Sequence, residues 1–182
     1  MEAASKRPWL LRGAVLGLAL VVGLIAWIAG GDDEGGEAAS AGTEARIVEP
    51  AELANVAVTL GHPVYWAGPI GGTELELTEG EDGSTQVRYL EEGADAGDES
   101  PETLTIGSYL LPDPAGALDK FAAEPGSVAE RGSGGLEIVY GKSNPSSVYF
   151  VPADGSVQIE VYDPRPRRAL ELALSGRVRP AD

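Results

Sequence analysis

The chain has 182 residues, 43% of them apolar and 23% charged, which is enough for one globular domain with appendages. Its formal net charge of −16 argues against nucleic-acid binding, which requires a basic surface that neutralises phosphates, and disfavours docking onto anionic lipid. With no cysteine and a single histidine, the chain cannot form a disulfide, a thiolate nucleophile or a multi-histidine metal site. We therefore expect no metal and no cofactor.

A hydrophobic segment near the N-terminus predicts a membrane anchor. Residues 13–30 carry no charge, and as a helix they would cover about 27 Å, close to the hydrocarbon thickness of a bilayer. Basic residues precede this segment within 1–12, whereas acidic residues occupy 32–34. The positive-inside rule therefore places residues 1–12 in the cytoplasm and the chain after residue 30 outside the cell membrane.

Two alternatives compete with a single-pass transmembrane helix at 13–30. One is a cleaved signal peptide, whose apolar region is usually shorter, about 7–15 residues, and the other is a buried globular helix. Residues 31–47 are rich in glycine, alanine and acidic residues, and such a segment cannot bury enough apolar surface to become ordered. We interpret it as a flexible, disordered linker with a reach of roughly 20–25 Å, followed by an extracytoplasmic domain at 48–182.

The domain begins with a predicted helix over 50–60. Pro50 suits a first helical turn, apolar residues recur at helical spacing, and Gly61 is a preferred residue for ending a helix. Pro63 prevents the helix from continuing and favours an extended conformation before it.

The chain's single histidine, His62, lies just past this helix. The partial negative charge of a helix C-terminus favours an imidazolium there, which is a structural role. The alternative is a ligand contact in which Tyr65 or Trp66 forms a stacking wall.

The next elements are strands, and the first is the short β-prone run at 64–66. Alternation predicts a β-hairpin over 73–90 with Asp82 and Gly83 in its turn. The loop at 91–102 holds six carboxylates, so it is either a solvated acidic loop or a calcium site, although its spacing differs from that of an EF-hand. A further strand follows over 103–111.

The second half repeats this rhythm. Asp113 and Pro114 cap and open a helix, four strands follow between 127 and 162, and Asp163-Pro164 predicts a last helix that Gly176 ends. The order is thus helix, four strands, helix, four strands, helix. It indicates the α+β class, with helices packed on one face of one antiparallel sheet and a possible ββββα duplication.

The sequence contains few motifs that are typical of catalytic sites. No nucleophile elbow and no phosphate loop is present, so no catalytic residue is assigned. Paired carboxylates acting on a sugar are the one enzymatic option. Glu137 and Glu160 lie in apolar strands, but alternation predicts that both face solvent.

Arginines concentrate at the C-terminus, and we expect Arg165, Arg167 and Arg168 in the first turn of the last helix. Cations are unfavourable there because a helix N-terminus carries partial positive charge. Either the protein's own acidic residues compensate them, or they bind an anionic partner such as a cell-wall polymer or an acidic protein.

Four stretches carry a resemblance: LGHPVYWAG, SSVYFV, VQIEVYDP and LSGRVRP. In this combination the chain resembles an uncharacterised family of single-pass membrane proteins of actinobacteria with a small extracytoplasmic α+β domain. The resemblance spans roughly residues 52–180. It implies an anchored, outward-facing protein, and no activity or catalytic residue comes with it.

We predict a membrane-tethered extracytoplasmic binding or interaction domain of unknown ligand, with an envelope protein or cell-wall component as partner. The candidate contact residues are His62, Tyr65, Trp66, Arg165, Arg167 and Arg168. The alternatives are a carboxylate-based hydrolase of an envelope polysaccharide and a carrier or sensor of an apolar ligand. A hydrolase requires two converging carboxylates, a carrier requires an apolar cavity, and an interaction module requires an exposed apolar or basic patch.

Overall fold

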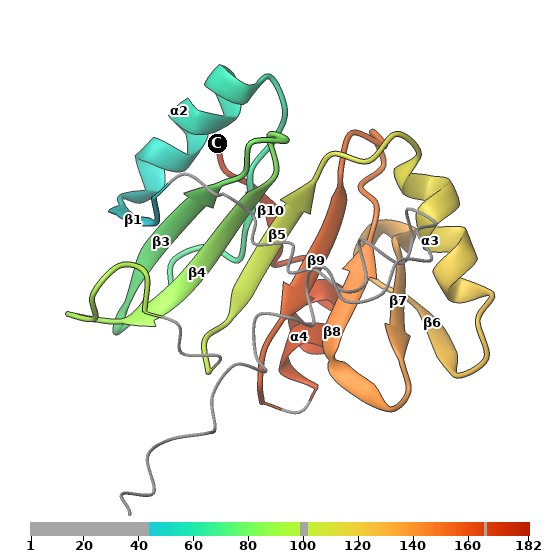
Figure 1. The fold of residues 1–182 in the computed structure, drawn as a ribbon. Coiled ribbons are helices and arrows are strands. Elements are labelled where there is room, and N and C mark those ends of the chain that lie inside the picture. Colours follow the sequence, from blue (N-terminus) through green and yellow to red (C-terminus); the bar gives the residue numbers. More distant parts are fainter. Residues whose placement is uncertain (1–43, 99–101, 166) are drawn as a thin grey trace, which may run out of the picture.

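The computed structural model describes residues 44–98, 102–165 and 167–182 (Figure 1). Its centre is an eight-stranded sheet. The strands are β1 (Arg46–Val48), β3 (Thr73–Glu79), β4 (Thr85–Glu91), β5 (Thr105–Tyr109), β6 (Ser127–Arg131), β7 (Glu137–Gly141), β8 (Asn144–Phe150) and β9 (Gln158–Tyr162). They lie in the order β1-β3-β4-β5-β9-β8-β7-β6, and all neighbours are antiparallel. The α+β class with a large antiparallel sheet is therefore confirmed.

The remaining elements pack around this sheet. They are the helices α2 (Pro50–Leu60), α3 (Pro114–Ala122) and α4 (Arg168–Leu174), the short 3-10 helix η1 (Ser133–Gly135), and a second sheet of β2 (Tyr65–Trp66) and β10 (Arg179–Pro180). The predicted helix over 50–60 is confirmed, because Gly61 adopts a left-handed φ of 75° and its N–H donates to the Ala57 carbonyl at 3.0 Å.

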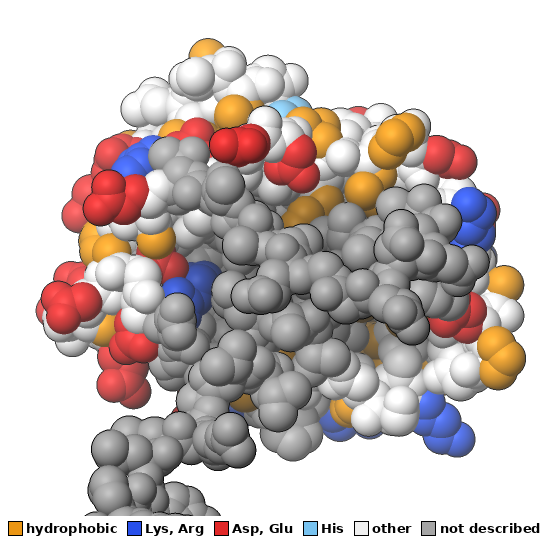
Figure 2. All heavy atoms as spheres, in the orientation of Figure 1, with side chains coloured by type: hydrophobic (Ala, Val, Ile, Leu, Met, Phe, Trp, Pro, Cys, Tyr) orange, Lys and Arg blue, Asp and Glu red, His pale blue; other side chains and the backbone are white. Residues whose placement is uncertain are grey.

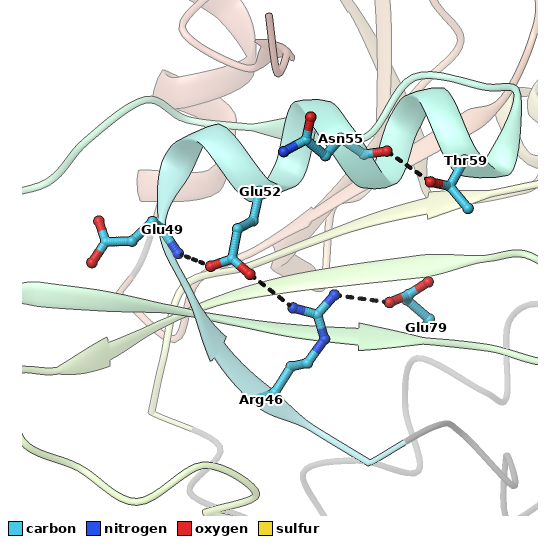
Figure 3. Close-up of polar contacts among 6 residues, drawn as sticks. All are labelled: Arg46, Glu49, Glu52, Asn55, Thr59 and Glu79. Carbon is cyan, nitrogen blue, oxygen red and sulfur yellow. Dashed lines mark hydrogen bonds and ion pairs between the residues drawn. The ribbon is translucent and has the colours of Figure 1, made fainter.

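The first strand begins at Arg46, inside the segment that the sequence assigns to the linker. Arg46 joins three elements, because its guanidinium lies 3.1 Å from Glu79 of β3 and 3.6 Å from Glu52 of α2 (Figure 3). Glu52 also accepts a 2.8 Å hydrogen bond from the Glu49 N–H at the start of α2. These contacts hold α2 against the edge of the sheet.

Helices cover both faces of the sheet, which corrects the prediction of one covered face. Ile138 of β7 packs into the core that contains α2 and α4. Its neighbour Val139 points to the opposite face, where it packs with Phe121 of α3 and Tyr149 of β8. The Phe121 and Tyr149 rings meet edge to face at 5.4 Å. The strands of this half are apolar on both faces, and two apolar faces require two covers.

Candidate functional site

A pocket of about 540 Å³ lies where four separate parts of the chain meet. Its wall is mainly apolar and consists of Tyr65 and residues 133–137, 150–153, 176 and 178–180. Ligand sites in proteins typically have volumes of about 300–1,000 Å³ and mostly apolar walls with a few polar groups. The pocket is open to solvent, and its volume falls within this range.

Glycines allow these segments to come together. Gly134 and Gly135 have positive φ values of 67° and 82°, which let the chain turn sharply between β6 and β7. Gly176 follows α4, and a Cβ on it would lie 3.1 Å from the Cβ of Ser133. A larger residue would crowd Ser133, and the φ of 71° at Gly176 also favours glycine.

Tyr65 is one of the polar residues of the pocket wall, with Ser133, Glu137 and Arg179. The residue is only 6% exposed, and its N–H donates to Ser108 Oγ at 3.2 Å. Its hydroxyl has no hydrogen-bond partner among the residues that the structure describes. Burial and then the charge of Asp154 raise the pKa of Tyr65 to about 12, so the hydroxyl keeps its proton at neutral pH.

The other aromatic candidates lie elsewhere. His62 is half-buried, and its Nε2 lies 2.9 Å from the Gly83 carbonyl oxygen. It therefore ties the end of α2 to the turn between β3 and β4, a structural role at a place the sequence did not indicate. Trp66 is 6% exposed within the core. Of the three aromatic candidates in this stretch, Tyr65 alone lines the pocket.

The arginine cluster differs from its prediction, because α4 begins at Arg168 and not at Pro164. Arg167 has a left-handed φ of 67°, which no helical residue can have. Asp163 does not cap the helix. Its carboxylate instead pairs with the Arg165 side chain, with Nη2 to Oδ2 at 2.6 Å and Nε to Oδ1 at 2.9 Å. The protein's own acid thus compensates Arg165, and the cluster lies at the end of α4 opposite to Gly176.

A second polar site is buried in the sheet and contradicts the prediction that Glu160 faces solvent. Glu160 is 3% exposed, and its carboxylate accepts hydrogen bonds from Tyr149 at 2.8 Å and from Tyr109 at 3.4 Å. Burial raises the pKa of Glu160 to about 7, although these hydrogen bonds oppose the shift. Its cross-strand neighbour Gly107 leaves room for the Tyr109 ring, which lies within 2.5 Å of where a Cβ would be. The alternation is regular, but both faces are buried there.

The acidic loop folds back onto the first half of the sheet. The Gly97 N–H donates to Glu76 Oε2 at 2.5 Å, and Glu76 also pairs with Arg88 at 2.8 Å, with side chains 1% and 11% exposed. Residues 99–101 of this loop lie outside the described residues. In the parts of the chain that are described, no group of three or more His, Asp or Glu side chains is placed to hold a metal ion.

Neither the glycine loop at 133–135 nor the segment 150–153 was a candidate from sequence. The pair Gly134-Gly135 marks a turn in the sequence, but a turn signal does not say which distant segments meet beside it.

No helix within residues 44–98, 102–165 and 167–182 is long and apolar enough to cross a membrane. The predicted anchor at 13–30 lies outside the described residues. Comparison with known proteins found no matching family model, no matching curated protein and no matching solved structure.

Proposed function

We propose that this chain is a membrane-tethered extracytoplasmic binding domain that holds a ligand in the pocket beside Tyr65. The observation that carries the proposal is a pocket of about 540 Å³ with a largely apolar wall, into whose lining Tyr65 brings a hydroxyl without a partner among the described residues. The charge pattern around residues 13–30 supports an anchor that leaves the domain outside the cell membrane. An envelope or cell-wall component is then the expected source of the ligand.

The distribution of charge supports a partner other than nucleic acid. Carboxylate side chains gather on the side of the molecule where β1, β3 and β4 lie (Figure 2). Together with the net charge of −16, such a surface repels phosphate backbones.

A carboxylate-based hydrolase has less support. The pKa of Glu160 is raised, as that of a general acid must be, but burial causes the shift and no second carboxylate contributes to it. Glycoside hydrolysis requires two carboxyl groups about 5–10 Å apart on either side of the substrate. The groups in contact with Glu160 are tyrosine hydroxyls instead.

The test compares a blocked pocket with an open one. Ala153 is exposed at the pocket wall, so Ala153→Trp fills the pocket without disturbing the core, whereas Ala51→Trp places the same side chain on the exposed face of α2. We purify the full-length chain and its variants from their own membrane and identify co-purifying small molecules by mass spectrometry. A compound retained by the wild type and by Ala51→Trp but lost from Ala153→Trp supports the proposal. A chain that retains nothing, or retains it equally in Ala153→Trp, contradicts it.

We further propose that the domain arose by duplication of a ββββα unit. Each half contributes four strands that run in chain order from an edge to the centre, β1-β3-β4-β5 and β6-β7-β8-β9, and a helix follows each half. In this view α2 and β2 are an insertion between β1 and β3. A superposition that fails to align the four strands of the two halves would contradict it.

A further inference from the structure

The carboxylates beside the pocket are unpaired, whereas the arginines beside it already have partners. Glu137 is part of the wall, and Asp154 directly follows wall residue Ala153. Neither carboxylate forms an ion pair with any cation that the structure describes. Arg179 of the wall lies 3.9 Å from the Asp182 carboxylate, and Arg177, between wall residues Gly176 and Val178, donates to the Ala67 carbonyl at 3.4 Å. The unpaired carboxylates therefore favour a cationic ligand over an anionic one.

Asp154 and Tyr65 offer the acceptors that such a ligand needs. Oδ1 of Asp154 accepts from the Ser156 N–H at 3.1 Å and from the Ser156 hydroxyl at 2.9 Å, and these bonds fix the orientation of the carboxylate. Its other oxygen has no partner among the described residues. Tyr65 lines the pocket, and its hydroxyl forms no hydrogen bond with the residues that the structure describes. The hydroxyl is therefore free to accept a hydrogen bond from a ligand that enters the pocket.

We propose that the pocket takes a small ligand in which an apolar body carries a positively charged head group, with the body against the apolar wall and the head group held by the Tyr65 hydroxyl and the Asp154 carboxylate. This inference rests on the proposed function and adds the chemical class of the ligand. Burial is the larger cause of the raised pKa of Tyr65, and the negative charge of Asp154 is the second. This agrees with a negative potential at the Tyr65 hydroxyl.

The test uses three probes of one shape and different charge: protonated 3-phenylpropylamine, 3-phenylpropanol and 3-phenylpropanoate. The full-length chain is labelled with 3-fluorotyrosine, and the fluorine resonance of Tyr65 is identified among the six tyrosines by its loss in Tyr65→Phe. Because the readout is the resonance of one residue, uptake of a probe by lipid or detergent does not count as binding. We expect the ammonium probe to shift this resonance with a dissociation constant about three- to fivefold lower than that of the alcohol, and the carboxylate to be the weakest.

Variants then assign the effect to the two groups. Asp154→Asn should bring the affinity for the ammonium probe down to that for the alcohol, and raising the salt concentration should do the same in the wild type. Asp119→Asn is the matched control, because Asp119 is exposed on α3 and lies outside the pocket wall, and it should not weaken binding. Tyr65→Phe lacks the reporting resonance, so probe binding to this variant is followed through the fluorescence of the chain. This variant should weaken the binding of the ammonium probe more than that of the carboxylate probe.

The outcomes separate the two proposals. Equal binding of the alcohol and the ammonium probe, tighter binding of the carboxylate, or no effect of Asp154→Asn overturns the cationic head group while the pocket remains a binding site. If no probe shifts the Tyr65 resonance, the inference on ligand class is overturned, and the co-purification experiment with Ala153→Trp still decides whether the pocket binds a ligand.

Discussion

The carboxyl group of Glu160 lies in the middle of the sheet, on β9, with tyrosine hydroxyls on both sides. Burial raises its pKa from an ordinary value of 4.5 to about 7. The folded protein therefore binds a proton on this group at pH values where the unfolded chain has already lost it. The free energy of unfolding must decrease as the pH rises through this range.

The first prediction concerns this pH dependence. Relative to Glu160→Gln, the wild type should lose stability as the pH rises from about 4.5 to about 7, by on the order of 3 kcal/mol if the whole shift is expressed. Urea unfolding of both proteins at a series of pH values measures it. Glu137→Gln, at an exposed position at the start of β7, is the control and should leave the change of stability with pH as it is in the wild type. A wild type whose stability is flat over this range contradicts the burial of Glu160.

The second residue-scale prediction concerns the ion pair of Glu76 and Arg88. Both side chains are largely buried, so removal of one partner leaves an uncompensated charge. We expect Arg88→Met to lower the free energy of unfolding by about 3–5 kcal/mol. The double variant Glu76→Gln with Arg88→Met should recover part of this loss, because it also removes the carboxylate charge that Arg88→Met leaves without this partner. Denaturant unfolding of the three variants measures the coupling, and a double variant less stable than Arg88→Met contradicts the pairing.

At the scale of elements, the two Asp-Pro sequences show that the same dipeptide can begin different structures. Asp113 caps α3 as predicted, since its Oδ1 accepts from the Gly116 N–H at 2.9 Å. Asp163 binds Arg165 instead, and α4 starts at Arg168. An arginine two residues after the aspartate competes for its carboxylate, whereas Ala115 offers no competitor. Whether the aspartate caps a helix thus depends on which donor its carboxylate binds.

This difference leads to the third prediction. Asp113→Ala should destabilise the protein by about 1 kcal/mol, the usual contribution of an N-cap side chain. Asp119→Ala removes a carboxylate from an exposed position inside the same helix and should cost less than half as much. Thermal unfolding of both variants compares them, and equal losses would show that charge and not capping matters at Asp113.

At the scale of the whole molecule, the N-terminal segment and the domain make different contributions to the proposed function. In the proposed function, the predicted anchor at 13–30 sets the membrane side on which the domain lies. The proposed choice of ligand belongs to the domain, because the pocket wall comes from segments between residues 65 and 180. Orientation and binding can therefore be tested separately.

The fourth prediction tests the orientation. The chain contains no cysteine, so single cysteines can be introduced without removing any. A membrane-impermeant maleimide should label Ala123→Cys, which is exposed at the end of α3, in intact cells that express the full-length chain. Ser5→Cys should react only after lysis. The unmodified chain is the blank, and labelling of Ser5→Cys in intact cells would contradict a cytoplasmic N-terminus.

Local signals in the sequence determined most of the elements of this domain. Pro50 and Gly61 delimit α2, Asp82-Gly83 forms the hairpin turn, and alternation identifies the faces of β3 and β4. These signals act over a few residues, through backbone conformations and side-chain periodicity that do not depend on distant contacts.

Only the tertiary structure decided which residues face each other and what lies over them. It buries Glu160 because α3 and tyrosines cover a face that alternation alone assigns to solvent. It pairs Arg165 with Asp163, so the charge of Arg165 is compensated within the protein. It also brings Tyr65 beside a glycine loop and a C-terminal strand that lie far away in the chain. The pairing of distant strands selects these neighbours, and periodicity within a strand carries no information about the element that packs on it.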